Sequence, residues 1–361
     1  MNRWLTCDRG SLSQVTTPRS GVQKSTSDRG PLSEVDPRPL HLTRGALAIA
    51  QPPAVDDAYQ AAADYRRAAR AANTVRAYSA DWRDFLSWCA SKQLAPLPAE
   101  PQTVAWYLGH LARELHRKPA TIERRLTAIA QAHQLAGEPS PTSTKAVRDV
   151  LSGIKRTHGT MQDAKAPALV EDLKAMLATL PDDVRGARDR ALLLVGFAGA
   201  FRREELAGIE VSDLEWTRAG VIVLLRHSKT DQEGLGRKVG IPLGHAETCP
   251  VRALRAWMRA AEISGGPVFR KVDRWGRPGS HPLCDKVVAL VVKRAARAAG
   301  LDADRYGGHS LRAGLATAAA NAGLEERKIM AQTGHKSVKM VRRYIRDAEL
   351  FRDNVAGQVG L

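Results

Sequence analysis

The chain has 361 residues and a hydrophobic content of 43%, which suits about two folded domains and is not typical of a disordered protein. Its formal net charge of +17 favours a polyanionic partner, nucleic acid first and an anionic membrane surface second. No apolar run approaches the ~18 residues of a membrane span, and the N-terminus lacks the apolar stretch of a secretion signal. The four widely spaced cysteines suggest neither a zinc site nor a disulfide framework, so a cytoplasmic, nucleoid-associated protein is expected.

Residues 1–52 are rich in Ser, Thr, Pro, Arg and Gly, and they show no sustained periodicity. They contain an imperfect repeat, "DRGSLSQV" from Asp8 to Val15 and "DRGPLSEV" from Asp28 to Val35. Two copies are too few for a solenoid, which needs about three stacked units. The segment is therefore predicted to be a flexible tail, with no role assigned to it.

Residues 53–158 have the pattern of a helical domain. In "AANTVRAYSADWRDFLSWCASKQ" the apolar residues recur at helical spacing, which predicts a helix starting after Asn73 or Thr74. Pro101 and Pro119 each open a further helix, and "TSTKAVRDVLSGIKRTHG" predicts a fourth. Short helices with basic outer faces indicate a domain that grips DNA.

Beyond a polar linker at 159–168, residues 169–346 predict a second domain that is mainly helical with a small antiparallel sheet. Two β-rich runs flank a polar, glycine-containing turn there, which predicts a β-hairpin. The predicted elements are helices over 169–180 and 184–199, strands over 220–225 and 238–243, and helices starting at Val251, Pro282, Ser310 and Glu325.

Four places in this second domain hold polar residues that a plain helical domain does not need. "GAFRREELAGI" places Arg202 directly after an apolar run and before Glu205. "RHSKTDQ" places Lys229 at the turn of the predicted hairpin. Taken singly, each is better explained as surface charge.

The other two places lie nearer the C-terminus. "GGHSLRAGLAT" puts His309 and Arg312 three residues apart, on one face at the start of a helix, where an anion binds well. "TGHKSVKMVRRYIR" puts His335 nine residues before Tyr344, which stands among basic residues. Tyr344 is either a packing residue of a basic helix or a nucleophile held against a phosphate.

Taken together and in order, these residues resemble the tyrosine recombinase (phage integrase) family. "GAFRREELAGI" resembles the family's "TGLRISELLGL" box, "HSLRAGLAT" its "HxLRHTFAT" box, and "TGHKSVKMVRRYIR" its "LGHxxxxxTxxYxH" box. The resemblance covers about residues 55 to 350, and "NTVRAYSADWRDFLSWC" and "TIERRL" are most similar to Cre recombinase. Ala313, Thr333 and Met340 depart from the common family residues, which are His, Leu and Thr.

The resemblance implies a two-domain DNA clamp without a cofactor or metal. Residues 53–158 would form a helical, SAM-like core-binding domain and residues 169–346 the catalytic domain. Residues 347–361 would dock on a neighbouring protomer, with docking on their own domain as the alternative. The implied partners are double-stranded DNA with inverted-repeat sites and three further copies in a tetramer on two sites, with accessory DNA-bending proteins as an option and no membrane.

The implied reaction is site-specific strand exchange through a 3′-phosphotyrosyl link and a Holliday junction, without ATP. The resemblance assigns these roles: Tyr344 as nucleophile, Arg202 and Arg312 as the phosphate clamp, His309 as base, Lys229 as acid, His335 as a hydrogen-bond donor to the phosphate, and Glu205 as support for a basic partner. It also gives Arg76, Arg124, Arg125 and Lys286 as candidates for base reading, with phosphate contact or plain solvation as the alternative.

Two other functions fit part of the sequence. A DNA-binding protein without catalysis could use the same fold, but the family's six catalytic positions are all filled, by Arg202, Lys229, His309, Arg312, His335 and Tyr344. A type IB topoisomerase shares the Arg, Lys, His and Tyr chemistry, but the Cre-like N-terminal helices argue against it. Integration, excision, resolution and inversion use one active site and stay open.

Overall fold

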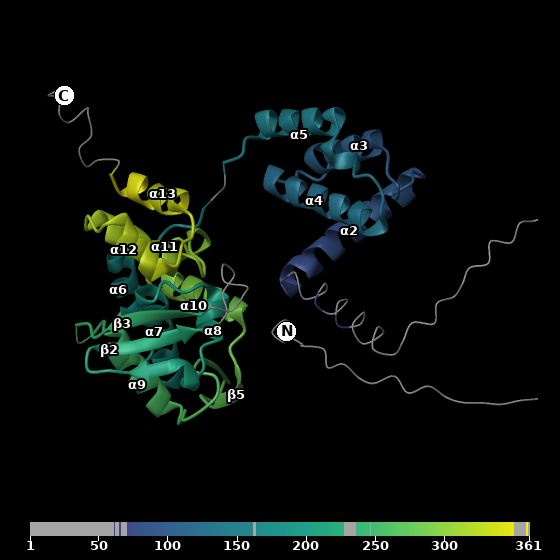
Figure 1. Cartoon of the computed structure of the whole chain (residues 1–361). Helices are drawn as coiled ribbons and strands as arrows, with labels where there is room; N and C mark the ends of the chain where they lie inside the picture. Colours follow the sequence, from purple (N-terminus) through teal and green to yellow (C-terminus); the bar gives the residue numbers. More distant parts are fainter. Residues whose placement is uncertain are drawn as a thin grey trace, which may run out of the picture. The chain divides into compact units, whose positions relative to one another are not determined.

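The computed structural model describes residues 61, 65, 71–161, 164–226, 236–245, 247–349 and 359. The predicted tail at 1–52, Lys229 and most of the predicted C-terminal tail lie outside the described residues. The described chain forms two compact units, one ending at residue 162 and one beginning at residue 163 (Figure 1). Among the described helices, none has the length and apolar character needed to cross a bilayer.

The N-terminal unit is a bundle of helices. Its fully buried residues include Phe85, Tyr107, Leu108 and Ile129, which come from three different helices and form one core. Pro101 and Pro119 open helices as predicted. The elements described are α2 (Ala72–Lys92), α3 (Pro101–Arg113), α4 (Pro119–Ala136), a short 3₁₀ turn (Pro141–Ser143) and α5 (Lys145–His158).

The start of α2 differs from the prediction. The amides of Thr74 and Val75 already donate to the carbonyl of Ala71, at 2.8 and 3.1 Å, so the helix begins at Ala72 rather than after Asn73 or Thr74. The Asn73 side chain accepts a hydrogen bond from Arg76 inside the helix instead of capping it. A good capping residue next to a helix start was therefore not used as the cap.

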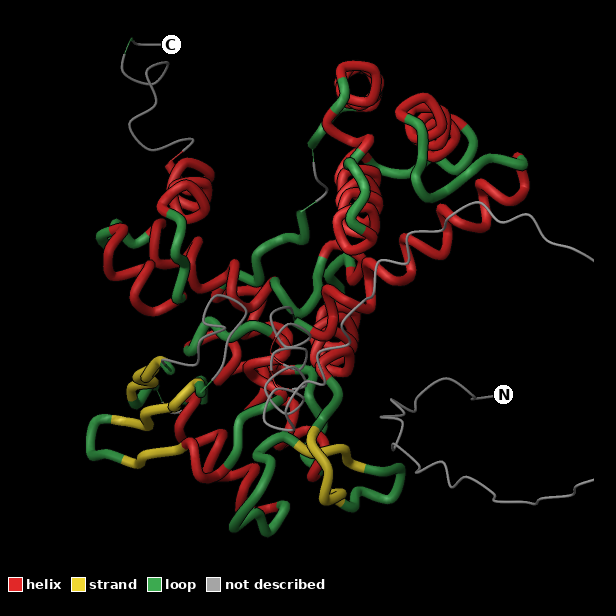
Figure 2. Tube along the Cα trace, turned by 45° about the vertical axis from the view of Figure 1, so that its right-hand side comes forward, coloured by secondary structure: helices red, strands yellow, loops and turns green. Residues whose placement is uncertain are grey.

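The C-terminal unit combines helices with two small sheets, which Figure 2 shows as separate groups of strands. One sheet has the antiparallel order β1–β2–β3 and the other is the pair β4–β5. Its elements are α6 (Val170–Ala178), α7 (Val184–Ala198), α8 (Arg203–Ala207), β1 (Leu214–Trp216), β2 (Gly220–Leu225), β3 (Arg237–Pro242), α9 (Pro250–Ala260), β4 (Arg270–Val272), β5 (Pro278–Pro282), α10 (Asp285–Ala298), α11 (Ser310–Asn321), α12 (Glu326–Thr333) and α13 (Val338–Glu349).

The predicted hairpin is present as β2 and β3, and their register places Val221 opposite Ile241 and Val223 opposite Val239, all buried. Strand β1 and the β4–β5 pair were not predicted, because three-residue strands and a Pro- and Gly-containing strand carry little alternating pattern. The helix predicted from Pro282 starts at Asp285, since Pro282 ends β5 and pairs with Arg270.

Helices α11, α12 and α13 pack together around a small apolar cluster of Ala316, Ala320, Ile329 and Val341 (Figure 1). This cluster is separate from the main core around α7 and α9. Tyr344 packs against it from α13, and Arg342 of the same helix pairs with Glu326 of α12 at 3.0 Å.

The end of the predicted linker at 159–168 packs on the C-terminal unit. The amide of Ala166 donates to the carbonyl of Arg305 at 2.7 Å, and that of Ala168 donates to Ser310 at 2.9 Å. Ala168 is fully buried, and a Cβ on Gly314 of α11 would lie 1.9 Å from its carbonyl oxygen. This segment is thereby fixed beside the start of α11, where His309 is the N-cap and Arg312 lies in the first turn.

We expect Gly314→Ala to destabilise the C-terminal unit by about 1–3 kcal/mol, because the added methyl cannot fit against the Ala168 carbonyl. Gly153→Ala in α5 is the matched control. Its Cβ would meet nothing within 4 Å, so it should stabilise α5 by about 0.5–1 kcal/mol. Peptide-resolved hydrogen exchange reads both units in one experiment, and equal protection of α11 in wild type and Gly314→Ala would contradict the expectation.

Candidate active site

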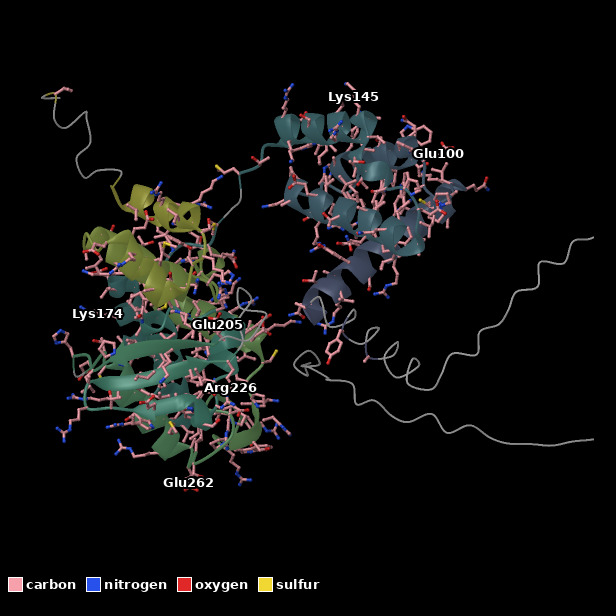
Figure 3. The ribbon with its side chains drawn as sticks, viewed as in Figure 1. Glu100, Lys145, Lys174, Glu205, Arg226 and Glu262 are labelled. Atoms are coloured by element: carbon pink, nitrogen blue, oxygen red, sulfur yellow. The ribbon has the colours of Figure 1, made fainter. Side chains whose placement is uncertain are left out.

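The loop between α7 and α8 holds Arg202. Ala200 adopts a left-handed backbone, φ 47°, which is rare outside glycine and typical of constrained functional loops. Its carbonyl accepts a hydrogen bond from Arg312 Nη1 at 2.7 Å. Glu205, labelled in Figure 3, accepts from the Arg202 backbone amide at 2.9 Å and from Arg202 Nη1 at 2.5 Å. One carbonyl and one carboxylate therefore orient the two arginines.

Arg312 is the deepest cation of the site, at 5% exposed. Its Nη2 is buried and has no hydrogen-bond partner among the residues described. Desolvation by burial, and then repulsion from Arg202, lower the pKa of Arg312 to about 10, so it stays charged at neutral pH. A buried guanidinium N–H without an acceptor indicates a place where an anionic ligand completes the hydrogen bonding.

Arg237, the first residue of β3, is a further cation of this site that sequence reasoning missed. Its Nη1 donates to the carbonyls of Ala331 and Gln332 at 3.1 and 3.0 Å, and its Nη2 is buried without a partner in the described part of the chain. Burial lowers the pKa of Arg237, which the nearby Glu205 opposes. In a basic chain one arginine at a strand start looks like surface charge, so no sequence signal marked it.

His335 and Tyr344 face each other, with ring centroids 6.0 Å apart and planes at 40°. Burial, and then repulsion from Arg312, Arg202 and Arg237, lower the pKa of His335 to about 4. The imidazole is therefore neutral at pH 7. The phenol of Tyr344 acts electrostatically on Arg312 in turn, which places the tyrosine beside the arginine cluster.

The structure thus gathers most of the predicted site residues, and it adds Arg237. His309 stands exposed at the N-cap of α11, three residues before Arg312. Lys229 lies outside the described residues. The residues brought together are Arg202, Glu205, Arg312, His335 and Tyr344. With His335 neutral, the described cluster of three arginines and one glutamate carries a net charge of +2.

Three of the four candidates for DNA reading are accessible. Arg76 is exposed on α2, and Lys286 is exposed on the first turn of α10. Arg124 is 49% exposed and makes a two-fold hydrogen bond to Asp81, at 2.8 and 2.9 Å. These side chains can reach a ligand, although Arg124 would have to break or share its hydrogen bonds with Asp81 to bind one.

Arg125 differs from its neighbour. Its side chain is 10% exposed and donates to Asp84 and, at 2.8 Å, to the hydroxyl of Tyr107. It therefore joins α2, α3 and α4 inside the N-terminal unit. This is the position of a residue that holds helices together, and it does not suit the base reading predicted for Arg125.

The lowered pKa of His335 gives a stability prediction. The unfolded histidine has a pKa near 6.5 and the folded one about 4, so the unfolded chain binds the proton first as the pH falls. The neutral ring of His335 therefore contributes its full share of stability above pH 6.5. We expect the free energy of unfolding of the C-terminal unit to fall by up to about 3 kcal/mol between pH 6.5 and 4. His335→Gln should flatten this slope in denaturant titrations, whereas His281→Gln, at an exposed strand position, should leave it unchanged.

Comparison with known proteins agrees with this site. The sequence pattern described as "Phage integrase family" matches residues 169–350, which span every candidate catalytic residue. The chain belongs to the phage integrase family of tyrosine recombinases. It is a site-specific DNA recombinase of the Xer type.

Similarity also extends into the N-terminal unit. An integrase/recombinase xerD homolog of Selenomonas ruminantium is 44% identical over 296 residues, covering 80% of this chain and 86% of that protein. Recombinase Cre of Escherichia phage P1 is 25% identical over 288 residues, covering 74% and 82%. The expected resemblance to Cre is confirmed, and the identity to the xerD homolog is higher.

Solved structures share the fold. The XerH recombinase in its post-cleavage complex superposes with a TM-score of 0.55 at 18% identity, over 72% of each chain. The Tn1549 transposon integrase in complex with a circular intermediate DNA gives a TM-score of 0.50 at 18% identity, over 70% of this chain and 85% of that one. The predicted mainly helical fold class is therefore confirmed.

Proposed function

We propose that Tyr344 cuts DNA by attacking a backbone phosphate that Arg202, Arg312 and Arg237 bind. The observation that carries this proposal is the buried Nη2 of Arg312, which has no partner within the described ranges and belongs to a cluster beside Tyr344. A second such nitrogen, on Arg237, belongs to the same cluster. Both atoms need an acceptor with several oxygens, and a phosphodiester supplies them.

The charge of the cluster suits the reaction. Attack by the Tyr344 oxygen gives a five-coordinate phosphorus whose non-bridging oxygens carry more negative charge than the ground state. Guanidiniums already fixed by Glu205 and the Ala200 carbonyl need no reorganisation to meet that charge. The resulting phosphotyrosyl bond keeps the energy of the broken phosphodiester, so rejoining needs no ATP.

The leaving 5′-oxygen needs a proton. Lys229, at the turn of the predicted hairpin, is the proposed donor, and the described strands β2 and β3 lead to that turn. Arg237 begins β3 and bonds to the end of α12, so the hairpin is anchored next to His335. This anchor supports a role of the hairpin in the active site.

We further propose the assembly implied by the family. Residues 53–158 bind the core of the DNA site, residues 169–346 carry out catalysis, and residues 347–361 contact a neighbouring protomer in a tetramer on two inverted-repeat sites. XerH, which shares the fold, was solved on a palindromic difH substrate, and a palindrome contains two inverted half-sites. A cytoplasmic location on the nucleoid and help from DNA-bending proteins complete the proposal.

The test is capture of covalent protein–DNA adducts from cells under denaturing conditions, followed by sequencing of the attached DNA. Adducts that map to inverted repeats support the proposal and identify the target site. Binding without adducts would favour a DNA-binding protein that does not cut. Relaxation of a supercoiled plasmid that lacks the recovered site would favour a type IB topoisomerase.

A further inference from the structure

A buried carboxylate on α2 holds a half-exposed arginine on α4. Asp81 is 4% exposed, and it accepts two hydrogen bonds from Arg124, one from Nε at 2.8 Å and one from Nη2 at 2.9 Å. The side chain of Arg124 is 49% exposed. Helices α2 and α4 pack against each other in the N-terminal unit (Figure 1). The carboxylate therefore lies in the interior, while the guanidinium that it binds reaches the surface.

A second arginine stands behind the carboxylate. Nε of Arg125 lies 3.7 Å from Oδ1 of Asp81, and Nη1 of Arg125 donates to Asp84 and to the hydroxyl of Tyr107. Tyr107 is fully buried and donates to Asp84 in turn, at 2.6 Å. These contacts join α2, α3 and α4 through Arg125. The unit therefore does not need Arg124 to hold its helices together.

The two hydrogen bonds fix the direction of the Arg124 guanidinium. A guanidinium has five N–H groups in one plane. Asp81 accepts from the edge formed by Nε–H and one N–H of Nη2. The outer end of the fork, with one N–H on each Nη, points away from Asp81, so Arg124 can keep Asp81 while it binds a second acceptor. This end is already oriented before a ligand arrives, which reduces the entropy lost on binding.

The outer end of such a fork matches one base of DNA. In the major groove guanine presents two neighbouring acceptors, O6 and N7, and an arginine that donates to both is the commonest specific contact. Adenine presents one acceptor and one donor there, cytosine a donor, and thymine one acceptor and a methyl group. Among the four bases, guanine alone accepts both hydrogen bonds from a fixed fork.

The charge of the pair favours a base over a phosphate. Asp81 cancels the charge of Arg124, so the pair adds little to the attraction of a polyanion, and burial of Asp81 carries a desolvation penalty. Phosphate binding does not need a fixed direction, and exposed arginines such as Arg76 and Arg83 on α2 can provide it. A carboxylate buried behind an arginine is useful where the direction of the fork decides what binds.

We propose that Arg124 reads a guanine in the major groove of the target DNA, and that Asp81 is the positioning residue that aims its guanidinium. The proposal rests on the proposed role of residues 53–158 in DNA binding, and it is independent of the chemistry of Tyr344. The sequence left base reading, phosphate contact and solvation open for Arg124, and the proposal selects the first. Since the proposed site has two inverted halves, the same guanine should recur in each half.

Selection from random DNA tests the base preference without cleavage. The full chain is mixed with duplexes that carry a randomised centre, and bound duplexes are recovered by mobility shift and sequenced. We expect wild type to enrich an inverted repeat with a guanine at one fixed position of each half. Arg124→Ala should accept any base at that position and keep the rest of the repeat, because only the contact to this base is lost.

Arg83→Ala is the matched control. Arg83 is exposed on α2, and its Nε donates to the carbonyl of Ser79 in the same helix at 3.3 Å. The variant loses the same charge as Arg124→Ala from the same unit, but it loses no contact with a buried carboxylate. It should enrich the wild-type repeat with the guanine kept at full preference.

Asp81→Asn tests the positioning role. The amide keeps the size of the side chain but removes the charge that fixes the fork of Arg124. The guanine preference should fall, and the preferences at all other positions should stay. A purely structural Asp81 would instead lower affinity for every sequence alike and leave the guanine preference unchanged, which would overturn its assignment. Hydrogen exchange of α2 and α4 shows whether the variant is folded.

A modified base tests the contact itself. Replacing the guanine by adenine should weaken wild-type binding roughly 5- to 150-fold, the usual discrimination of a bidentate base contact. 7-Deazaguanine, which lacks the N7 acceptor but still pairs with cytosine, should give part of that loss. Arg124→Ala should bind the guanine and 7-deazaguanine duplexes equally. If wild type also binds both equally, Arg124 does not donate to N7 and the proposal is wrong.

Three further results would overturn the proposal. Arg124→Ala weakens all sequences alike and lowers the salt slope of binding by about 1, which identifies a phosphate contact. Alternatively, Arg124→Ala binds and selects as wild type does, so Arg124 only accompanies Asp81. Finally, wild type enriches no sequence, which refutes the proposed DNA-binding role as well. The first two results leave that role intact, so the two failures are distinguishable.

Discussion

Tyr344→Phe should form no covalent DNA adduct while it still binds the target site. The substitution removes one oxygen, and the ring keeps its contacts with His335 and with the apolar cluster that holds α13. Loss of an enzyme's nucleophile costs roughly 10⁴-fold or more, so adducts should fall below detection. Denaturing gels of a nicked duplex measure the adduct, and mobility shifts at fixed salt measure binding.

The matched control is Tyr306→Phe. Tyr306 is mostly buried in the same unit, and its hydroxyl donates to Asp172 at 3.2 Å, away from the arginine cluster. This variant also loses a phenolic hydroxyl, and it should still form adducts. If Tyr344→Phe forms adducts as well, another nucleophile makes the link and the assignment is wrong.

The sequence predicted what is local. Apolar residues at helical spacing, prolines at helix starts and a polar turn between β-rich runs predicted most helices and the β2–β3 hairpin. The candidate nucleophile and its arginines could be predicted because the family keeps them in short boxes whose spacing survives in this chain. Strands of three residues, such as β1, carry too few residues for a pattern to form.

Arg237 could not be predicted, because its importance arises from a contact between distant parts of the chain. Arg237 meets the end of α12 more than ninety residues further on. Thr333 contacts only near neighbours, Ile329 and His335, but no pattern of residue types encodes which atoms its hydroxyl meets. Arg124 and Arg125 show the same limit: neighbours in sequence point to different surroundings on α4, one half exposed and one in the core.

Arg312→Lys should lower cleavage by about 10²–10³-fold, the usual effect of removing one donor to a developing oxyanion. Lysine keeps a positive charge but lacks the planar fork, so it cannot donate to the Ala200 carbonyl and to a phosphate oxygen in the same fixed geometry. Site binding should change little, because most affinity comes from other phosphate contacts spread over the DNA. Single-turnover cleavage of the nicked duplex at saturating protein measures the chemical step.

Arg190→Lys is the control for the same exchange elsewhere in the unit. Arg190 is half-buried on α7 and donates to the carbonyl of Leu177 at 3.2 Å. Its substitution by lysine therefore also replaces a guanidinium by an ammonium beside a backbone carbonyl. It should cleave as wild type does. If Arg312→Lys cleaves within about twofold of Arg190→Lys, the fork of Arg312 does not act on the transition state. Its buried Nη2 would then have to be explained by binding in the ground state, which would appear as weaker binding at unchanged cleavage.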